Sequence, residues 1–491
     1  RKTGDFAKAE ALINDSLAMD KFNMGCRFES YLIHTLQGNT EAAAAAKAEM
    51  KALMRGAVHS YLEYAIDYAS AGMYEEAAQL LSFVTEEDEA TYPMVYYALG
   101  YFASKMGKKD EALNLYKKAE TMCPDYCFPN KLEEVLMLND AMSLNPEGAK
   151  APYYLGNFHY AARIYDEAIA CWEKSASIDD TYPTVLRNLS LAYYNKQHNP
   201  QKALATLEKA YNLDTTDARI LMELDQLYKK LRYPHRQRLD FLEAHADVVE
   251  QRDDLCIERI TLYNQLGEYQ KAYDLINSRK FHPWEGGEGK VTSQYLLCRV
   301  ELAKIAIREG RFADAVRLLK ETEKYPDNLG EGKLSMAEEN DIHYWMGCAY
   351  EGLGEEALAK EYFTKATKGS AEPAIAFFYN DQQPDKIFYQ GLAWRKLGEE
   401  DKARSRFNRL IKHGEKHLFD KVKIDYFAVS LPDLLIWDDD LNVRNQIHCN
   451  LVMGMGYLGL GDKEQARKFL SEVARLDINH QAGKQLLEMC G

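Results

Sequence analysis

A recurring alanine is the feature that most constrains what this chain of 491 residues can fold into. An alanine near the start of a predicted helix returns at intervals of 34, 34, 35, 56, 35, 34, 35, 43, 44, 44 and 63 residues, with Gln237 taking one of the places. The alanines are Ala9, Ala43, Ala77, Ala112, Ala168, Ala203, Ala272, Ala315, Ala359, Ala403 and Ala466. Fixed periods of this size indicate a stacked array of two-helix units rather than one globular core.

The unit at residues 96–124 shows the pattern most clearly. Gly100 lies on a first predicted helix, and Ala112 and Tyr116 lie four residues apart on a second. Small residues at Gly100 and Ala112 let two antiparallel helices approach closely, while the Tyr116 ring fills the space beside them. Gly107, between the helices, suits a left-handed turn. The same spacing returns around Gly347, Gly391 and Gly454.

This spacing resembles the tetratricopeptide repeat (TPR). The resemblance implies an all-α fold, a right-handed superhelical solenoid of about 11–12 TPR-like helix pairs. The first helices of the pairs would line a groove that binds a protein or peptide. The longer intervals after Ala272 predict elongated loops between repeats in the C-terminal half.

The intervals also predict a division of the chain into four parts. These are regular units at 1–124 with an incomplete first repeat, an extra-helix insertion at 125–150 with its helix at 131–144, further units at 151–280, and loop-elaborated units at 281–491. The chain starts at Arg1 with a lone second helix over residues 2–17. We therefore expect it to be a fragment of a longer protein.

Two of the long connections are copies of each other. Residues 283–292 and 326–335 both read P-x3-G-E-G-K-apolar-[T/S]. Glycines leave backbone N–H groups open to an anion, to which Lys290 and Lys333 would add charge. The other interpretation is a tight turn, with Ser335 and Glu338 capping the next helix.

Aromatic rings and carboxylates or amides gather in other connections, at Glu339–Trp345, Phe377–Asp385 and Lys423–Pro432. Ring faces and side-chain acceptors are the chemistry that sugars need, although the same residues could pack the loops down and keep them soluble. The candidate ligand-binding residues are Trp284, Glu285, Lys290, Asn328, Lys333, Asp341, His343, Tyr379, Asn380, Asp381 and Tyr426.

Residues 279–491 also resemble, more closely than generic TPRs do, the C-terminal part of a group of large bacterial proteins of unknown function. The resemblance lies in His282–Lys290, Glu339–Trp345, Phe378–Asp381 and Lys423–Pro432. It implies a missing N-terminal β-sandwich domain similar to sugar mutarotases, and a tie to carbohydrate. It supplies no catalytic residue.

The usual TPR register places several aromatic residues in the groove of the N-terminal half. The candidate groove residues are Tyr97, Tyr101, Tyr153, Asn157 and Tyr160. TPR modules that clamp acidic chaperone tails use Lys and Asn at such positions in adjacent repeats, and this chain does not. The groove therefore suits an apolar or extended partner.

Composition narrows the function further. The net charge is −15 and Lys/Arg runs are lacking, so we expect no nucleic-acid or membrane partner. No apolar run approaches the ~20 residues that span a bilayer. Nine scattered cysteines suit a reducing, cytoplasmic location and give no metal-ligand spacing. We expect a non-catalytic scaffold without cofactor or metal, whose partner is a protein, a peptide or the missing domain. The alternatives are saccharide recognition, or part of a carbohydrate-active enzyme, through the loop-rich half.

Overall fold

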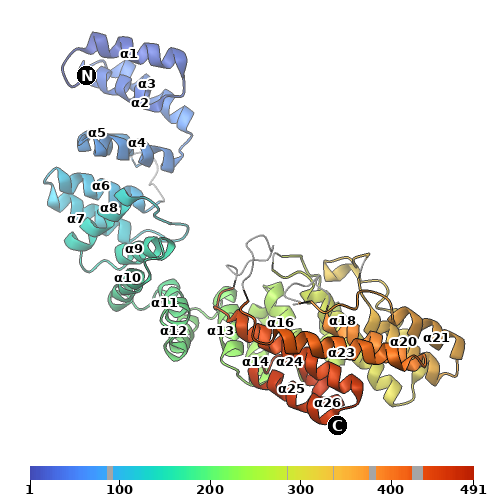
Figure 1. Cartoon of the computed structure of the whole chain (residues 1–491). Coiled ribbons are helices and arrows are strands. Elements are labelled where there is room, and N and C mark those ends of the chain that lie inside the picture. Colours follow the sequence, from blue (N-terminus) through green and yellow to red (C-terminus); the bar gives the residue numbers. More distant parts are fainter. Residues whose placement is uncertain (86–91, 285, 336, 375–382, 423–434) are drawn as a thin grey trace. The chain divides into compact units, whose positions relative to one another are not determined.

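The structure is a computed structural model that describes residues 1–85, 92–284, 286–335, 337–374, 383–422 and 435–491 (Figure 1). The chain divides into two compact units, Arg1–Gln197 and His198–Gly491. Over the described ranges both units are helical throughout and contain no strand, which confirms the predicted all-α repeat fold. The four-part division of the sequence stays a prediction.

The first unit holds four helix hairpins, with single helices before, between and after them. Its helices are α1 (Phe6–Met19), α2 (Met24–Leu36), α3 (Thr40–Met54), α4 (Val58–Ser70), α5 (Tyr74–Ser82), α6 (Met94–Lys105), α7 (Lys109–Glu120), α8 (Leu132–Leu144), α9 (Lys150–Ala161), α10 (Tyr165–Ile178) and α11 (Pro183–Asn195).

The second unit opens with α12 and continues with six hairpins and a last helix, α26. Its helices are α12 (Pro200–Leu213), α13 (Ala218–Lys230), α14 (His235–Ala244), α15 (Ala246–Val249), α16 (Asp253–Gln265), α17 (Tyr269–Asn277), α18 (Lys290–Arg308), α19 (Phe312–Lys320), the 3-10 helix η1 (Asp327–Leu329), α20 (Asn340–Gly352), α21 (Glu356–Ala366), α22 (Pro384–Lys396), α23 (Glu400–His417), α24 (Leu441–Leu460), α25 (Lys463–Leu476) and α26 (Gln481–Met489).

Several hairpins close by fitting a large side chain of the second helix onto a glycine of the first. A Cβ atom on Gly100 would lie 2.4 Å from the ring of Tyr116, so only glycine lets α6 and α7 come this close. The same fit recurs in four more hairpins, between Gly156 and Trp172, Gly347 and Phe363, Gly391 and Phe407, and Gly454 and Leu470. The recurring alanines Ala112, Ala168, Ala315 and Ala403 are fully buried. The predicted close approach of paired helices is therefore confirmed.

The extra helix in the insertion is also confirmed. It is α8, one residue shorter than predicted, and it packs against both α6 and α9. Asp140 of α8 accepts hydrogen bonds from the hydroxyls of Tyr116 (2.6 Å) and Ser104 (3.2 Å). The helix is thus stacked into the array beside α6 and α7.

The duplicated loops form a turn, but Ser335 does not cap the next helix as predicted. Helix α20 begins five residues later, with Glu339 at its N-cap, and residues 337–339 lie outside any helix. Lys333 pairs with Glu339 at 2.5 Å and donates to the carbonyl of Glu323 at 3.3 Å. These tertiary contacts hold the segment away from the position that a capping serine would need.

The two ends of the second unit are joined. The indole N–H of Trp437, a residue only 2% exposed, donates to the carbonyl of Glu223 in α13 at 3.1 Å. Lys230 pairs with Asp439 at 2.9 Å. Asn479 of the α25–α26 turn contacts Lys229 of α13 and Arg238 of α14, and Lys484 of α26 donates to the carbonyl of Gln265 at the end of α16. The sequence predicted an open superhelix for this half and did not indicate this closure.

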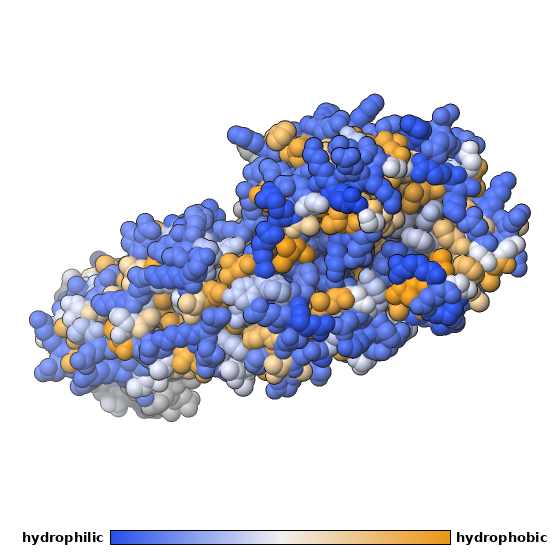
Figure 2. All heavy atoms as spheres, turned by 90° about the horizontal axis from the view of Figure 1, so that it is seen from below, coloured by the Kyte–Doolittle hydropathy of each residue, from blue (hydrophilic) through white to orange (hydrophobic). Residues whose placement is uncertain are grey.

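Hydrophilic side chains cover most of the face drawn in Figure 2, and apolar side chains form small scattered patches on it. No helix among the described residues is long and apolar enough to cross a membrane. Across the same ranges all nine cysteines are free thiols.

Candidate functional site

A cavity of the second unit lies between α22, α24 and the α25–α26 turn, and we call it the α22–α24 pocket. Its volume is about 320 Å³. Its lining residues are Gln383, Pro384, Asp385, Arg444, Ile447, His448, Leu451, Met455, Asp477, His480 and Ala482. Helix α24 thus contributes apolar side chains together with Arg444 and His448, α22 contributes Asp385, and the α25–α26 turn contributes Asp477 and His480.

Two of the three elements that line the pocket, α22 and α24, are first helices of hairpins. We call the surface that the first helices α18, α20, α22 and α24 make together the first-helix face. Lys304 of α18 lies 5.3 Å from the ring of Trp345 in α20. The Trp345 indole N–H in turn donates to the hydroxyl of Tyr389 in α22 at 3.3 Å. Lys386 of α22 pairs with Asp341 of α20 at 2.5 Å. Contacts between polar and aromatic groups therefore run from α18 through α20 to α22.

Two carboxylates share Lys386 beside the pocket. Its ammonium lies 2.5 Å from Asp341 and 3.3 Å from Asp385. Burial would lower the pKa of Lys386, but the two carboxylates more than offset this effect and raise it. Burial raises the pKa of Asp385, against the effect of the ammonium. The lysine is therefore charged at neutral pH, with its shorter contact to Asp341.

Two histidines lining the pocket are neutral at pH 7. Burial lowers the pKa of His448 to about 4, and its Nε2 lies 2.8 Å from the carbonyl of Ala374. Burial also lowers the pKa of His480, whose Nδ1 accepts the backbone N–H of Gly483 at 3.0 Å and caps α26. These bonds place the ring proton on Nε2 in both histidines.

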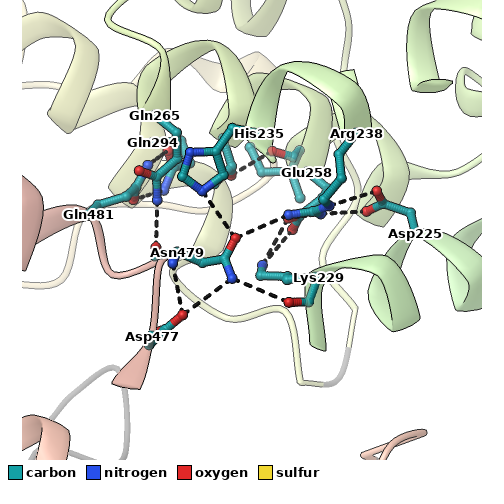
Figure 3. A network of polar contacts seen from close by, with 12 residues as sticks. Asp225, Lys229, His235, Arg238, Glu258, Gln265, Gln294, Asp477, Asn479 and Gln481 are labelled. Atoms are coloured by element: carbon teal, nitrogen blue, oxygen red, sulfur yellow. Dashed lines mark hydrogen bonds and ion pairs between the residues drawn. The ribbon is translucent and has the colours of Figure 1, made fainter. Parts of the chain in front are cut away.

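A polar network fixes the α25–α26 turn against the start of the unit (Figure 3). Asp477 accepts the backbone and side-chain N–H groups of Asn479 at 2.8 and 3.2 Å. The Asn479 side-chain oxygen accepts from Arg238 at 3.3 Å and lies 3.2 Å from Nε2 of His235. Gln294 and Gln481 join α18 to α26 at 2.9 and 3.1 Å. The contacts that join this turn and α26 to the start of the unit therefore span 187 to 250 positions of the chain.

The centre of this network is a buried ion-pair cluster. The Arg238 guanidinium, 1% exposed, donates to Asp225 at 3.0 and 2.7 Å and to Glu258 at 2.7 Å. Lys229 donates to Glu258 at 2.8 and 3.0 Å. The Lys229 and Arg238 charges lower the pKa of Glu258, although burial acts in the opposite direction. Removing one partner of such a cluster costs about 3–5 kcal/mol, since it leaves a buried charge uncompensated.

Asn328, one of the ligand-binding residues predicted in the duplicated loops, uses its polar groups in contacts within the protein. Its amide donates to the carbonyls of Ile276 and Arg279, both at 2.9 Å, and its backbone carbonyl accepts the N–H of Phe281 at 2.7 Å. Glu331, three residues on, accepts the N–H of Gly289, which caps α18, at 3.2 and 3.1 Å. The second duplicated loop therefore holds the first duplicated loop in place.

The other loop candidates lie in separate places. The Trp284 ring covers Gly287 of its own loop so closely that a Cβ atom on this glycine would lie 2.0 Å from it, and the ring is therefore partly used in packing. Burial lowers the pKa of Lys290, and the nearby Lys229 ammonium adds to this effect. Glu285 lies outside the described residues, as do Tyr379, Asn380, Asp381 and Tyr426.

Three predicted residues do gather around Glu339. They are Lys333, its ion-pair partner, and Asp341 and His343 of the first turn of α20. Burial lowers the pKa of His343, and the Glu339 and Asp341 charges oppose it. Of these three residues, only Asp341 is linked to the α22–α24 pocket, because it shares Lys386 with the lining residue Asp385.

The predicted groove residues of the first unit differ in exposure. Tyr97 is fully buried, with its hydroxyl on Glu120 at 2.7 Å, and Tyr153 is 4% exposed. Tyr101, Asn157 and Tyr160 are half-buried. The Asn157 oxygen already accepts the Trp172 indole N–H at 3.1 Å. Three of the five therefore reach the surface.

Sequence reasoning missed most of the pocket. Arg444, His448, Asp477 and His480 belong to no predicted stretch, whereas Asp385 ends the predicted stretch Phe377–Asp385. The missed residues carry no periodic signal, because the repeat pattern fixes only small and apolar positions. Over the described ranges no group of three or more His, Cys, Asp or Glu residues could hold a metal ion.

Comparison with known structures returns helical-repeat proteins. PilF of Pseudomonas aeruginosa is 19% identical, with 45% of this chain and 90% of that chain covered and a TM-score of 0.27. YrrB, described as a TPR protein with an unusual peptide-binding site, is 18% identical, covering 43% of this chain and 95% of that chain, with a TM-score of 0.20. The P58(IPK) TPR domain is 14% identical over 88% of this chain and 97% of that one, with a TM-score of 0.22.

Comparison with protein families identifies the repeats directly. Tetratricopeptide repeat models match residues 95–126 and 341–368, and a second model of the same repeat matches 387–413. These segments contain three of the hairpins that close by a glycine against a ring, α6/α7, α20/α21 and α22/α23. The chain therefore contains tetratricopeptide repeats at these three places.

Proposed function

We propose that this chain is a non-catalytic scaffold for protein–protein binding, and that its second unit holds an extended polypeptide on the first-helix face. The observation that carries the proposal is the α22–α24 pocket, which is lined by two of these first helices, α22 and α24. Helical repeats commonly bind extended segments on the surface made by their first helices. The pocket gives such a segment one place to insert a side chain.

The aromatic row beside the pocket supports this proposal. Trp345 and Tyr344 are half-buried, so part of each ring is open to a partner, while the Tyr389 hydroxyl holds the Trp345 indole N–H. Half-open aromatic rings with a polar edge are the groups most enriched at protein interfaces. In the first unit, Tyr101 and Tyr160 would serve a second contact of the same kind.

Saccharide recognition through the loop-rich half is the weaker proposal. Asn328 and Lys333, two of its expected ligands, already bind backbone carbonyls and Glu339. The part of Trp284 that remains open is the feature in its favour. A partner domain in a longer protein likewise stays a prediction from the resemblance.

The proposal is tested by selecting binders from a random-peptide display library against the full chain. Affinities of the selected peptides are then measured by fluorescence anisotropy on two variants. Ala482→Trp puts a large ring into the pocket, and Ala357→Trp makes the same change on the exposed surface of α21. We expect Ala482→Trp to weaken binding at least tenfold and Ala357→Trp to leave it unchanged. Selection that enriches no peptide, or equal binding by both variants, would contradict the proposal.

A further inference from the structure

The charges around the α22–α24 pocket do not balance. Asp385 and Asp477 enter the lining from different elements, the first turn of α22 and the end of α25. The cation nearest to Asp385 is Lys386, which lies closer to Asp341. The bonds described for Asp477 come from the neutral N–H groups of Asn479. Among the described residues, Asp385 thus shares its cation with Asp341, and Asp477 forms no ion pair.

The remaining charged group of the lining is Arg444. Its guanidinium lies 3.9 Å from Asp439, a carboxylate outside the pocket, and it has further contacts. The two imidazoles add no positive charge at pH 7, because burial keeps them neutral. His448 keeps Nδ1 as an acceptor, since its Nε2 is used by Ala374. The lining thus combines two carboxylates and neutral acceptors with one guanidinium, which has partners outside the pocket.

The size and the apolar wall of the pocket fit one long side chain. A volume of about 320 Å³ lies at the lower end of the range of ~300–1,000 Å³ that is usual for small-ligand pockets. Ile447, Leu451 and Met455 form an apolar wall along α24. Lysine and arginine combine an aliphatic stem, which packs on such a wall, with a charged head that seeks carboxylates.

We propose that the α22–α24 pocket binds the cationic side chain, lysine or arginine, of a partner polypeptide, with its head between Asp385 and Asp477. This inference rests on the proposed function, because it names the residue that an extended partner inserts.

The test uses small probes, so that it does not depend on finding the partner. N-acetyl-arginine amide and its neutral isostere N-acetyl-citrulline amide are titrated into the full chain labelled with ¹³C at histidine. The His448 and His480 ring signals are assigned with His448→Gln and His480→Gln. We expect saturable shifts of both rings with the arginine probe and at least tenfold weaker binding of the citrulline probe.

Variants of the two carboxylates test which charges bind the arginine probe. Asp385→Asn and Asp477→Asn should each weaken binding of the arginine probe at least fivefold, whereas Asp401→Asn, on the exposed first turn of α23, should not. Equal binding of arginine and citrulline probes by the unmodified chain would overturn the inference whether or not the variants fold. So would preferred binding of N-acetyl-glutamate amide, which would assign the pocket to an anion on Arg444.

The outcomes separate the two proposals. If the arginine probe binds but the peptide library yields nothing, the cation pocket stands and the scaffold proposal fails. If selected peptides bind in a manner sensitive to Ala482→Trp but keep their affinity when each Lys and Arg is replaced by Gln, the scaffold stands and the cation inference fails.

Discussion

At the scale of single residues, the hairpins depend on glycines whose missing side chain is replaced by a ring. A Cβ on Gly391 would lie 2.4 Å from Phe407, which is fully buried and cannot swing away. Gly391→Ala should therefore destabilise the fold by about 1–3 kcal/mol, the usual cost of overpacking. Urea unfolding of Gly391→Ala, Phe407→Leu and the double variant checks this. The smaller Leu leaves room for the methyl group, so the double variant should lose less than the two single losses combined.

His448 makes stability depend on pH. Its pKa is about 4 in the fold and about 6.5 when unfolded, so below pH 6.5 the unfolded chain takes up a proton that the folded chain does not. Stability should fall as the pH drops from about 6.5 to about 4, by at most about 3 kcal/mol, and no further below that from this group. His413 and His480 face His448 and titrate as well. The contribution of His448 is therefore the difference between the unfolding free energies of the native chain and His448→Gln at each pH.

At the scale of elements, the second duplicated loop holds in place the segment that leads into the first duplicated loop. Asn328 can do this because an amide donates two N–H groups, one to Ile276 and one to Arg279. A carboxylate of the same shape only accepts. Asn328→Asp should destabilise the fold by about 2–3 kcal/mol, at least as much as Asn328→Ala, because it faces two carbonyls with a negative charge. The control is Asn408→Asp, the same change on an exposed position of α23, which should stay within about 0.5 kcal/mol of the native chain. If Asn328→Asp proves as stable as the native chain in urea unfolding, the two bonds are not needed.

The sequence predicted the helix hairpins better than it predicted the loops or the long-range contacts. The hairpins and α8 could be predicted because a glycine, an alanine and a bulky residue at helical spacing describe contacts within one hairpin, as Gly100, Ala112 and Tyr116 do. The cap of α20 could not, because Ser335 and Glu338 have the local pattern of a capping box while tertiary contacts of Lys333 hold the segment elsewhere. Residue types alone likewise gave no sign that Asn328 and Glu331 would bind the preceding loop rather than a ligand.

At the scale of the whole molecule, the second unit is distinguished by its joined ends. Arg238, Gln265 and Gln294 meet a turn that lies 187 to 241 positions further on. Such contacts leave no periodic trace in the sequence, since the polar residues that make them occur once each. The pocket is as hard to predict, because its polar residues come from three separate elements.

Because the ends of the second unit are joined, a short truncation at its C-terminus should affect helices far away in the sequence. Ending the chain after Leu476 removes the turn and α26, and in any helical array this would expose α25. In the closed unit it should also raise amide hydrogen exchange in α13 and α16, at least tenfold for the backbone N–H groups near Lys229 and Gln265, because those helices lose their partners. Mass spectrometry of exchanging peptides checks this. Exchange unchanged in α13 and α16, with an increase confined to α25, would show that the ends do not support each other in solution.

The joined ends also restrict how this unit can evolve. An open array tolerates the gain or loss of a repeat at any point, because each repeat touches only its neighbours. Here one repeat more or fewer would move Asn479 away from Arg238 and leave a buried cluster of charges without its closing contact. Homologues of this unit are therefore expected to keep the number of hairpins between α13 and α26 and to vary in length within the loops.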